Sequence, residues 1–184
     1  MENRITSYSL RQGLIFGLIN ILLTLIIYFL GADFFASHFI MLPVLLLIIA
    51  IVYPIVLTIR YRKLNGGFLS FKDAYKISFF VMLISGLIVA LFGILLYHVI
   101  DPEYPKMIQD KMIEKISEYM ANAGLSEEKI QSSLNPNEFA DKFSLFGQIK
   151  SFLFSIIFYA IFSLIVAAIA KKNEQPFDSK VLDK

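Results

Sequence analysis

Four long runs of apolar residues, set apart by polar segments, form the main pattern along this chain. They cover residues 12–30, 39–59, 77–99 and 149–170. A helix rises about 1.5 Å per residue, so each run has about the 20 residues that a helix needs to cross a hydrocarbon layer of roughly 30 Å. The pattern predicts an all-α fold: a polytopic membrane protein in which one membrane domain, residues 1–184, contains four transmembrane helices.

Two polar segments lie outside these runs. Residues 101–147 separate the third run from the fourth, and a tail of residues 173–184 follows the fourth. Four residues of the first segment recur at helical spacing: Met112, Ile116, Tyr119 and Met120. Such spacing gives an amphipathic helix, so we expect a short helical insert between the third and fourth spans. The polar tail is expected to be disordered.

The composition agrees with membrane spans and excludes several classes of protein. Hydrophobic residues make up 57% of the chain and charged residues 17%, with a mean hydropathy of +0.68. In a typical soluble domain, about a quarter of all residues are charged. The formal net charge of +2 is too small to indicate nucleic-acid binding. The absence of cysteine excludes disulfides, thiolate metal sites and cysteine nucleophiles.

Basic residues alternate between the two sides of the predicted spans. The loop between the second and third spans is basic and contains Arg60, Arg62 and Lys63, whereas the segment 101–147 has five lysines against nine acidic residues. The positive-inside rule therefore predicts that both termini and the basic loop are cytoplasmic and that the insert is extracytoplasmic. The same three basic residues are candidates for binding anionic lipid head groups.

Small residues within the spans mark faces on which helices can pack closely. Gly13 and Gly17 are four residues apart in the first span, and Gly86, Ala90 and Gly93 share one face of the third. Because small side chains let two backbones approach each other, we expect these faces to contact neighbouring spans.

Polar residues are also spaced regularly within the spans. A stripe at four-residue intervals runs along the fourth span: Ser151, Ser155, Tyr159 and Ser163. We expect this stripe, with Ser155 and Ser163, to pack against other spans; a polar pore lining is the alternative. Asn20 is the most polar residue in the apolar part of the first span. A buried amide needs a partner, so Asn20 is expected to hydrogen-bond to a neighbouring helix.

Two short motifs resemble those of a known family. The first surrounds the start of the third span, and the second begins the insert: Asn65-Gly66-Gly67 with Ser70-Phe71-Lys72-Asp73-Ala74, and Tyr97-His98-Val99-Ile100-Asp101-Pro102-Glu103-Tyr104. With the order of three spans, insert and fourth span, they resemble the uncharacterised bacterial membrane family named domain of unknown function 4199. The resemblance implies a multi-pass protein of the bacterial cytoplasmic (inner) membrane. It implies no known activity and transfers no catalytic residue.

Chemistry within the membrane usually requires ionisable residues in the spans, since they are costly there and tend to mark function. The cores of all four runs lack Asp, Glu, Lys and Arg. We therefore expect no enzyme, no catalytic residue and no cofactor. His98, Asp101 and Glu103 are the metal-ligand types that lie closest together in the sequence, but helix capping and interfacial placement explain them without a metal.

The leading functional hypothesis is a non-enzymatic bacterial envelope protein that acts through protein or lipid contacts. Its expected partners are the lipid bilayer and either another envelope protein or a second copy of itself, with no nucleic acid. The expected contact face is the apolar side of the insert helix, from Met112 to Met120. The alternative is an oligomeric passive transporter or channel subunit, in which Asn20 and two prolines of the second span, Pro43 and Pro54, shape a polar path.

Overall fold

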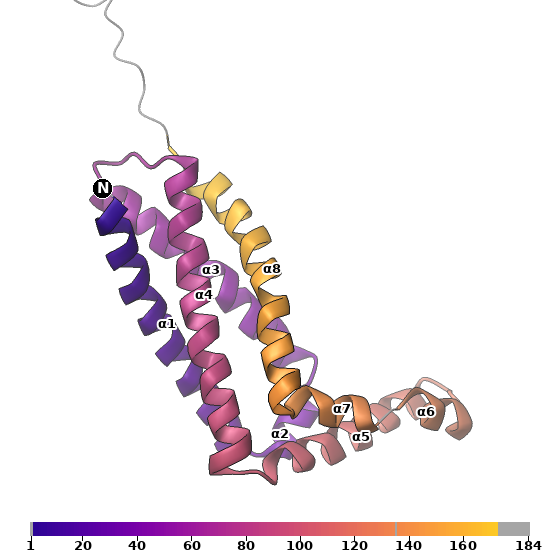
Figure 1. Ribbon diagram of the computed structural model, residues 1–184. Coiled ribbons are helices and arrows are strands. Elements are labelled where there is room, and N and C mark those ends of the chain that lie inside the picture. Colours follow the sequence, from indigo (N-terminus) through magenta and orange to yellow (C-terminus); the bar gives the residue numbers. More distant parts are fainter. Residues whose placement is uncertain (1, 135, 173–184) are drawn as a thin grey trace, which may run out of the picture.

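The computed structural model describes residues 2–134 and 136–172, and helices joined by short connections make up this part of the chain (Figure 1). Four helices in this part of the chain are long and apolar enough to cross a membrane. They are α1 (Glu2–Leu30), α3 (Met41–Leu64), α4 (Phe71–Leu95) with its π-helical continuation η1 (Leu96–Ile100), and α8 (Leu145–Ala170). The predicted all-α fold with four spans is confirmed. The predicted disorder of the tail concerns residues outside the described part.

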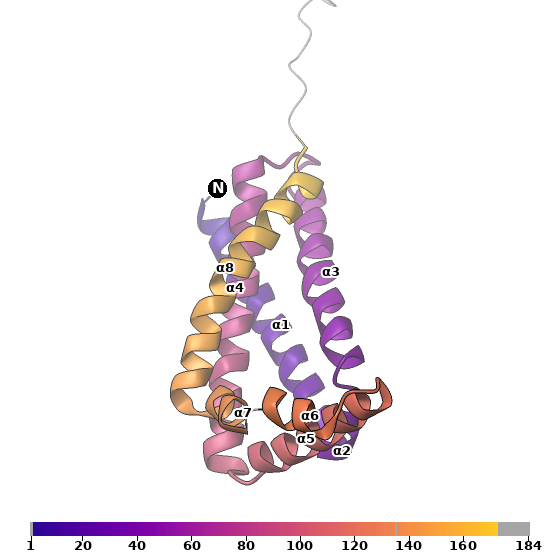
Figure 2. The same cartoon turned by 90° about the vertical axis from the view of Figure 1, so that its right-hand side faces the viewer.

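Short helices connect the spans at one end of the bundle. Helix α2 (Ala32–Ser37) joins α1 to α3, and three helices lie between the third and fourth spans. These are α5 (Tyr104–Asn122), α6 (Glu127–Ser133) and α7 (Pro136–Phe143). Figure 1 and Figure 2 show these three helices at the end of the bundle opposite the N-terminus, with α6 extending past the side of the spans. The helical insert expected from the sequence is confirmed.

Local signals in the sequence fix where the helices begin and end. Ser70 caps α4, since its hydroxyl accepts a hydrogen bond from the backbone N–H of Asp73 at 3.1 Å. Ser144 caps α8 in the same way through Gly147, at 2.9 Å. After the C-terminal end of α5, Gly124 has a φ of +81°, a left-handed conformation that favours glycine. The amphipathic α5 therefore ends two residues before this glycine.

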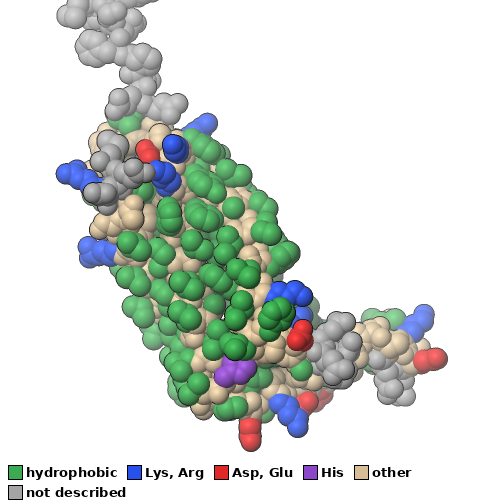
Figure 3. Space-filling model, viewed as in Figure 1, with side chains coloured by type: hydrophobic (Ala, Val, Ile, Leu, Met, Phe, Trp, Pro, Cys, Tyr) green, Lys and Arg blue, Asp and Glu red, His purple; other side chains and the backbone are tan. Residues whose placement is uncertain are grey.

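The sides of the bundle are apolar. Figure 3 shows hydrophobic side chains covering the long face of the molecule, with most charged side chains near its two ends. Large apolar side chains on all four spans are exposed, among them Leu18 at 59% and Phe29 at 79%. Such a continuous apolar surface faces lipid when the four helices cross a bilayer.

At the end of the bundle that contains the N-terminus, all four spans pack around one apolar core. We call this part the closed half. Its core contains residues of α1, α3, α4 and α8: Ile5, Phe16, Leu57, Tyr61, Leu69, Ala74, Ile77, Val81, Ala167 and Ala170. The chain also closes this end with polar contacts, because the Arg62 guanidinium donates to the carbonyl of Ala170 at 2.9 Å. Leu69 and Lys172 exchange two backbone hydrogen bonds of 2.9 Å.

Toward the insert the spans separate, and we call this part the open half. Here α4 remains in contact with α1 and with α8, while α3 and α8 diverge (Figure 2). A small second cluster of Ala32, Tyr104 and Ile108 packs α5 against α2. The Lys111 ammonium and the Asp33 carboxylate form an ion pair of 3.0 Å between the same two helices. The insert is thus attached to the bundle at its edge, beside the diverging spans.

The two prolines of α3 have different positions. Pro43 lies in the first turn of the helix, where a missing N–H leaves no internal hydrogen bond unmade. Pro54 lies inside the helix, so the carbonyl of Ala50, four residues earlier, has no intrahelical donor. The carbonyl of Pro54 itself accepts a hydrogen bond of 2.7 Å from the Thr58 hydroxyl.

Candidate functional site

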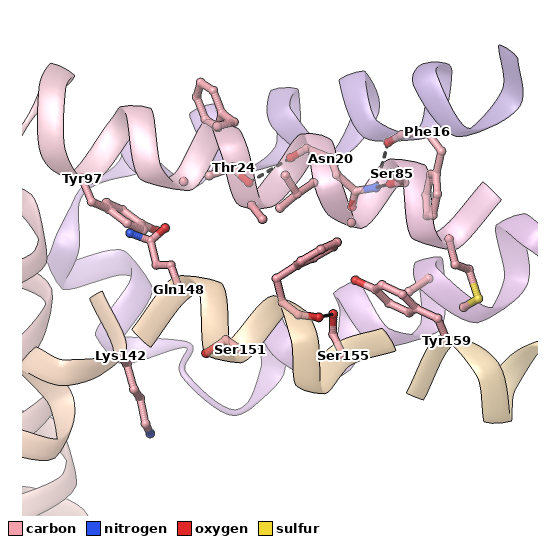
Figure 4. Close-up of a pocket in the computed structure, with 18 residues that line it drawn as sticks. Phe16, Asn20, Thr24, Ser85, Tyr97, Lys142, Gln148, Ser151, Ser155 and Tyr159 are labelled. Atoms are coloured by element: carbon pink, nitrogen blue, oxygen red, sulfur yellow. Dashed lines mark hydrogen bonds between the residues drawn. The ribbon is translucent and has the colours of Figure 1, made fainter. Parts of the chain in front are cut away.

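A pocket of about 380 Å³ lies in the open half, between α1, α4 and α8 (Figure 4). Helix α3 contributes Ala50 to its lining. Many of the lining residues have neutral polar side chains, among them Asn20, Thr24, Ser85, Ser151, Ser155 and Tyr159. Figure 4 places Asn20 and Ser85 on one side of the space, and Ser151, Ser155 and Tyr159 on the other. The pocket is therefore a mixed polar and apolar space within the depth of the spans.

The pocket is elongated along the bundle. Its lining on α8 runs from Gln148 to Tyr159, which at helical rise corresponds to about 16 Å. Tyr97 and Gln148 line the end near the insert, and Phe16 and Met82 line the end next to the closed half. Phe16 also stacks on Tyr53 of α3, with ring centroids 4.2 Å apart. This contact lies at the boundary between the pocket and the closed core.

Asn20 joins two spans at the wall of the pocket. Its side-chain nitrogen donates to the carbonyl of Phe16 at 2.8 Å and to the hydroxyl of Ser85 on α4 at 3.4 Å. The hydroxyl of Thr24 donates to the backbone carbonyl of Asn20 at 2.9 Å. The predicted hydrogen bond from Asn20 to a neighbouring helix is confirmed. Both hydrogens of the Asn20 side-chain amide are donated in these bonds. The side-chain oxygen takes part in neither bond and can still accept one.

The glycines of α1 and α4 lie at close helix contacts. A Cβ atom added at Gly13 would lie 2.8 Å from Cβ of Ile84 and 3.2 Å from the carbonyl oxygen of Val81, and one at Gly17 would lie 2.8 Å from Cδ1 of Ile88. These two glycines therefore allow α1 to pack against α4. At Gly86 the added atom would overlap the Tyr159 ring, 2.8 Å from its Cζ. Gly86 thus makes room for an aromatic ring of α8.

The other small residues of these faces divide between packing and the pocket. Ala90, Gly93 and Ser155 line the pocket. Ser163 is fully buried in the closed half, where its hydroxyl lies 3.7 Å from the sulfur of Met82. The polar stripe of the fourth span therefore divides between packing and lining a polar space. Ser163 packs against another span, whereas Ser151 and Ser155 line the pocket.

The three residues with metal-ligand chemistry do not converge. Asp101 accepts from the Tyr28 hydroxyl at 3.0 Å and from the backbone N–H of Tyr104 at 3.1 Å, as a helix cap does. A ring nitrogen of His98 lies 3.2 Å from the side-chain nitrogen of Gln148. Within residues 2–134 and 136–172, no group of three or more His, Cys, Asp or Glu side chains is arranged to hold a metal, and Glu103 is exposed.

The face of α5 expected to bind a partner is partly used inside the chain. Met112 packs against the cluster of Ala32, Tyr104 and Ile108, and the Tyr119 ring, 54% exposed, lies 5.6 Å from that of Phe39. Ile116 and Met120 are half-buried. Tyr104, the first residue of the same helix, is buried, and this burial raises the pKa of its hydroxyl to about 12. Partner binding by this face stays a prediction.

The three basic residues predicted in a loop lie instead in the last turns of α3, and they differ in accessibility. Arg60 and Lys63 are exposed, whereas Arg62 is half-buried and bonded to Ala170. A basic residue of the insert, Lys111, is paired instead: hydrogen bonds to Asp33, the larger cause, and to Glu114 raise its pKa. Binding of lipid head groups by Arg60, Arg62 and Lys63 stays a prediction, and the geometry leaves Arg60 and Lys63 the more accessible of the three.

Sequence reasoning did not identify the pocket as a unit. Thr24, Ser85 and Gln148 line it, but none of them belongs to a motif or to a long stripe. The regular spacing of the serines of α8 and the polar side chain of Asn20 could be recognised in the sequence. That they face one another across a space depends on the angle between α8 and the other spans, which no local pattern encodes.

Comparison with known proteins places the chain in a family. No curated protein and no solved structure matches it. A family model described as "Protein of unknown function (DUF4199)" matches residues 11–172, which include all four spans and the insert. The chain, with its four candidate membrane spans, therefore belongs to this family of proteins of unknown function.

Proposed function

We propose that this is a non-enzymatic protein of the bacterial cytoplasmic membrane that acts by binding another membrane component, lipid or protein, in its open half. The observation that carries the proposal is the pocket of about 380 Å³ between spans that are tightly packed only at their other end. Protein pockets that bind ligands have volumes of about 300–1,000 Å³ and combine apolar walls with a few polar groups. The pocket has both properties.

The distribution of charge supports the orientation. Arg60, Lys63, Lys171 and Lys172 are exposed at the closed end of the bundle. The insert at the other end carries more acidic than basic residues. By the positive-inside rule the closed half and both termini face the cytoplasm. The pocket then lies toward the outer leaflet, with the insert helices outside the membrane.

The chemistry of the pocket favours binding over catalysis. Ser151, Ser155 and Tyr159 supply hydroxyl groups, but a hydroxyl nucleophile needs an adjacent base to activate it. Among the described residues that line the pocket there is no Asp, Glu, His or Cys. The basic side chain in the lining, Lys142 of α7, points away from Tyr159 (Figure 4). Neutral donors and acceptors in a fixed arrangement recognise a ligand by hydrogen bonds without transforming it.

Photo-crosslinking in native membranes tests the proposal. A benzophenone amino acid at Phe152, which lines the pocket, is compared with one at Phe158, which is exposed to lipid on the same helix. We expect a defined protein or lipid adduct from Phe152 and unselective phospholipid labelling from Phe158. Identical, unselective labelling at both positions would refute binding by the open half.

The second candidate is a passive transporter or channel subunit. It is favoured by Asn20 and by Ala50, whose carbonyl is released by Pro54, because both line the pocket. A continuous path would also require the closed half to part around Thr58, Ser78 and Val81, which are fully buried. Solute flux through the reconstituted protein tests this candidate, and flux that is abolished by filling the pocket would favour it over a binding protein.

A further inference from the structure

We infer that the pocket binds an uncharged amphiphile that carries carbonyl or hydroxyl groups and enters from the lipid bilayer beside α3. The inference rests on the proposed function, since it names the ligand class of the same site. It is carried by three properties of the pocket: its volume of about 380 Å³, a described wall in which Lys142 at the insert end is the charged residue, and its unused hydrogen-bonding groups.

The polar wall of the pocket separates a lipid-like ligand from a protein helix. A helix of a partner protein or of a second copy satisfies its own backbone groups, so it would leave the polar wall without partners. The volume of about 380 Å³ lies within the range of about 300–1,000 Å³ found for small-molecule sites.

The charge of the wall separates neutral ligands from ionic ones. Of the described residues that line the pocket, Lys142 alone is charged at neutral pH, and it belongs to α7 at the insert end. In Figure 4 its side chain points away from Asn20, Ser85 and Tyr159. A phosphate or carboxylate placed deeper in the pocket would meet no cation, and burying an unpaired charge at membrane depth is costly.

The hydrogen-bonding groups define the head of the ligand. Within the described part of the chain, the hydroxyls of Ser151 and Tyr159 make no hydrogen bond and so can donate to a carbonyl oxygen. The side-chain oxygen of Asn20, whose two amide hydrogens are occupied, can accept from a hydroxyl. Polar groups without partners are unfavourable in hydrocarbon, so a carbonyl or hydroxyl head between these side chains is stabilised.

The position of α3 gives the ligand its route. Ala50 is the α3 residue that lines the pocket, and α3 diverges from α8 in the open half. Of the four spans, α3 thus contributes the fewest of the described residues that line the pocket. A ligand dissolved in the outer leaflet can reach the pocket from the side toward α3 with its hydrocarbon part remaining in lipid.

The test uses the full chain in phosphatidylcholine nanodiscs with photoactivatable lipids of stated class. One arm contains a diazirine diacylglycerol, a second a diazirine quinone, and a third a diazirine phosphatidylglycerol, which is anionic. We expect at least one neutral probe to label peptides of α1, α4 or α8 at pocket residues, and the anionic probe to label the pocket roughly tenfold less, which corresponds to about 1.4 kcal/mol.

Two variants locate the binding. Ala90→Phe fills the pocket, and Ala168→Phe adds the same ring to an exposed position of α8 in the closed half. We expect roughly tenfold weaker labelling by the neutral probe with Ala90→Phe, and no change with Ala168→Phe. Asn20→Leu removes the acceptor and is expected to weaken the hydroxyl-bearing diacylglycerol more than the quinone, which has carbonyls alone. Circular dichroism and gel filtration check that each variant is folded.

The outcomes decide between the two proposals. Equal labelling of the pocket by the anionic and neutral probes, or unchanged labelling in a folded Ala90→Phe variant, would overturn the neutral amphiphile. So would the absence of pocket labelling by both neutral probes, as expected of a space that holds water. If Phe152 then crosslinks a defined protein in native membranes, the proposed function stands and the ligand class is wrong.

Discussion

The closed and open halves of this bundle are built from the same four helices, yet they use their polar residues differently. In the closed half, Ser78 donates to the carbonyl of Ala74 at 3.0 Å and Ser163 lies against Met82, so both hydroxyls are occupied inside the chain. In the open half, Ser151 and Tyr159 line a space. A serine in a membrane helix therefore acts as packing material or as a ligand contact according to whether the next helix covers it.

The largest expected difference between the halves is in the cost of a truncated side chain. Val81 is fully buried in the closed core, and Val89, two turns later on α4, lines the pocket. We expect Val81→Ala to lower the free energy of unfolding by about 2.5 kcal/mol, because it opens a cavity. Val89→Ala enlarges an existing space and should cost under about 1 kcal/mol. Denaturant unfolding in detergent measures both, and equal losses would contradict the division.

Adding a methyl group should have opposite effects at two glycines. Gly13→Ala forces Cβ against Ile84 and the Val81 carbonyl, and we expect a net loss of about 1.5 kcal/mol. Gly93→Ala meets the flexible end of Gln148, 2.9 Å away, so the higher helix propensity of alanine should give a gain of about 0.5 kcal/mol. The thermal midpoints of the two variants should therefore move in opposite directions. A loss at Gly93 would indicate that the open half is more rigid than described.

A smaller loss of stability is expected from removing the hydrogen bond that joins α3 to α8 at the basic end of the bundle. Arg62→Gln removes the hydrogen bond to the Ala170 carbonyl, and we expect a loss of about 1 kcal/mol because the guanidinium is only half-buried. Lys63→Gln is the control, since Lys63 is exposed next to it and should change stability little. Proteolysis near the end of α8 reports the opening of this contact. Equal sensitivity of the two variants would show that the bond contributes nothing.

The smallest effect is expected from alkaline pH on the insert. The pKa of Tyr104 is raised from 10.0 to about 12, and that of Lys111 is raised from 10.5. The unfolded chain loses these protons at lower pH than the folded chain, so their stabilisation is complete at neutral pH and declines as the pH rises from about 10 to about 12. Protease cleavage after α5 should increase in this interval before the closed half changes. Tyr104→Phe combined with Asp33→Asn should flatten the dependence.

The features that sequence could predict are those set by near neighbours. The four long apolar helices and the amphipathic insert helix follow from residue patterns within each segment. The cap at Ser70 and the end of α5 before Gly124 likewise depend on a few adjacent residues. The start of α8 at Leu145 is four residues earlier than the apolar run, since the Ser144 cap lets polar Gln148 lie inside the helix.

The pocket belongs to a different class of feature. The amide of Asn20 indicated a contact with another span, but not that Ser85 would be the partner or that a space would lie beside it. Its existence follows from the divergence of α8 from α3, which results from the sum of many contacts at the closed end. Small and polar stripes gave the candidate residues, and the tertiary arrangement decided which of them face the space.

The unequal lengths of neighbouring spans have a consequence for the surrounding lipid. Helix α3 has 24 residues, about 36 Å, whereas Phe71–Ile100 has 30 residues, about 45 Å. The first turns of the longer helix contain Lys72, Asp73 and Lys76, so part of its extra length lies outside the apolar run. Neighbouring spans of different apolar length are matched to one bilayer by tilt or by a local change in its thickness, at a fraction of a kcal/mol per Å. We therefore expect the lipid beside α3 to be more disordered than the lipid beside α4.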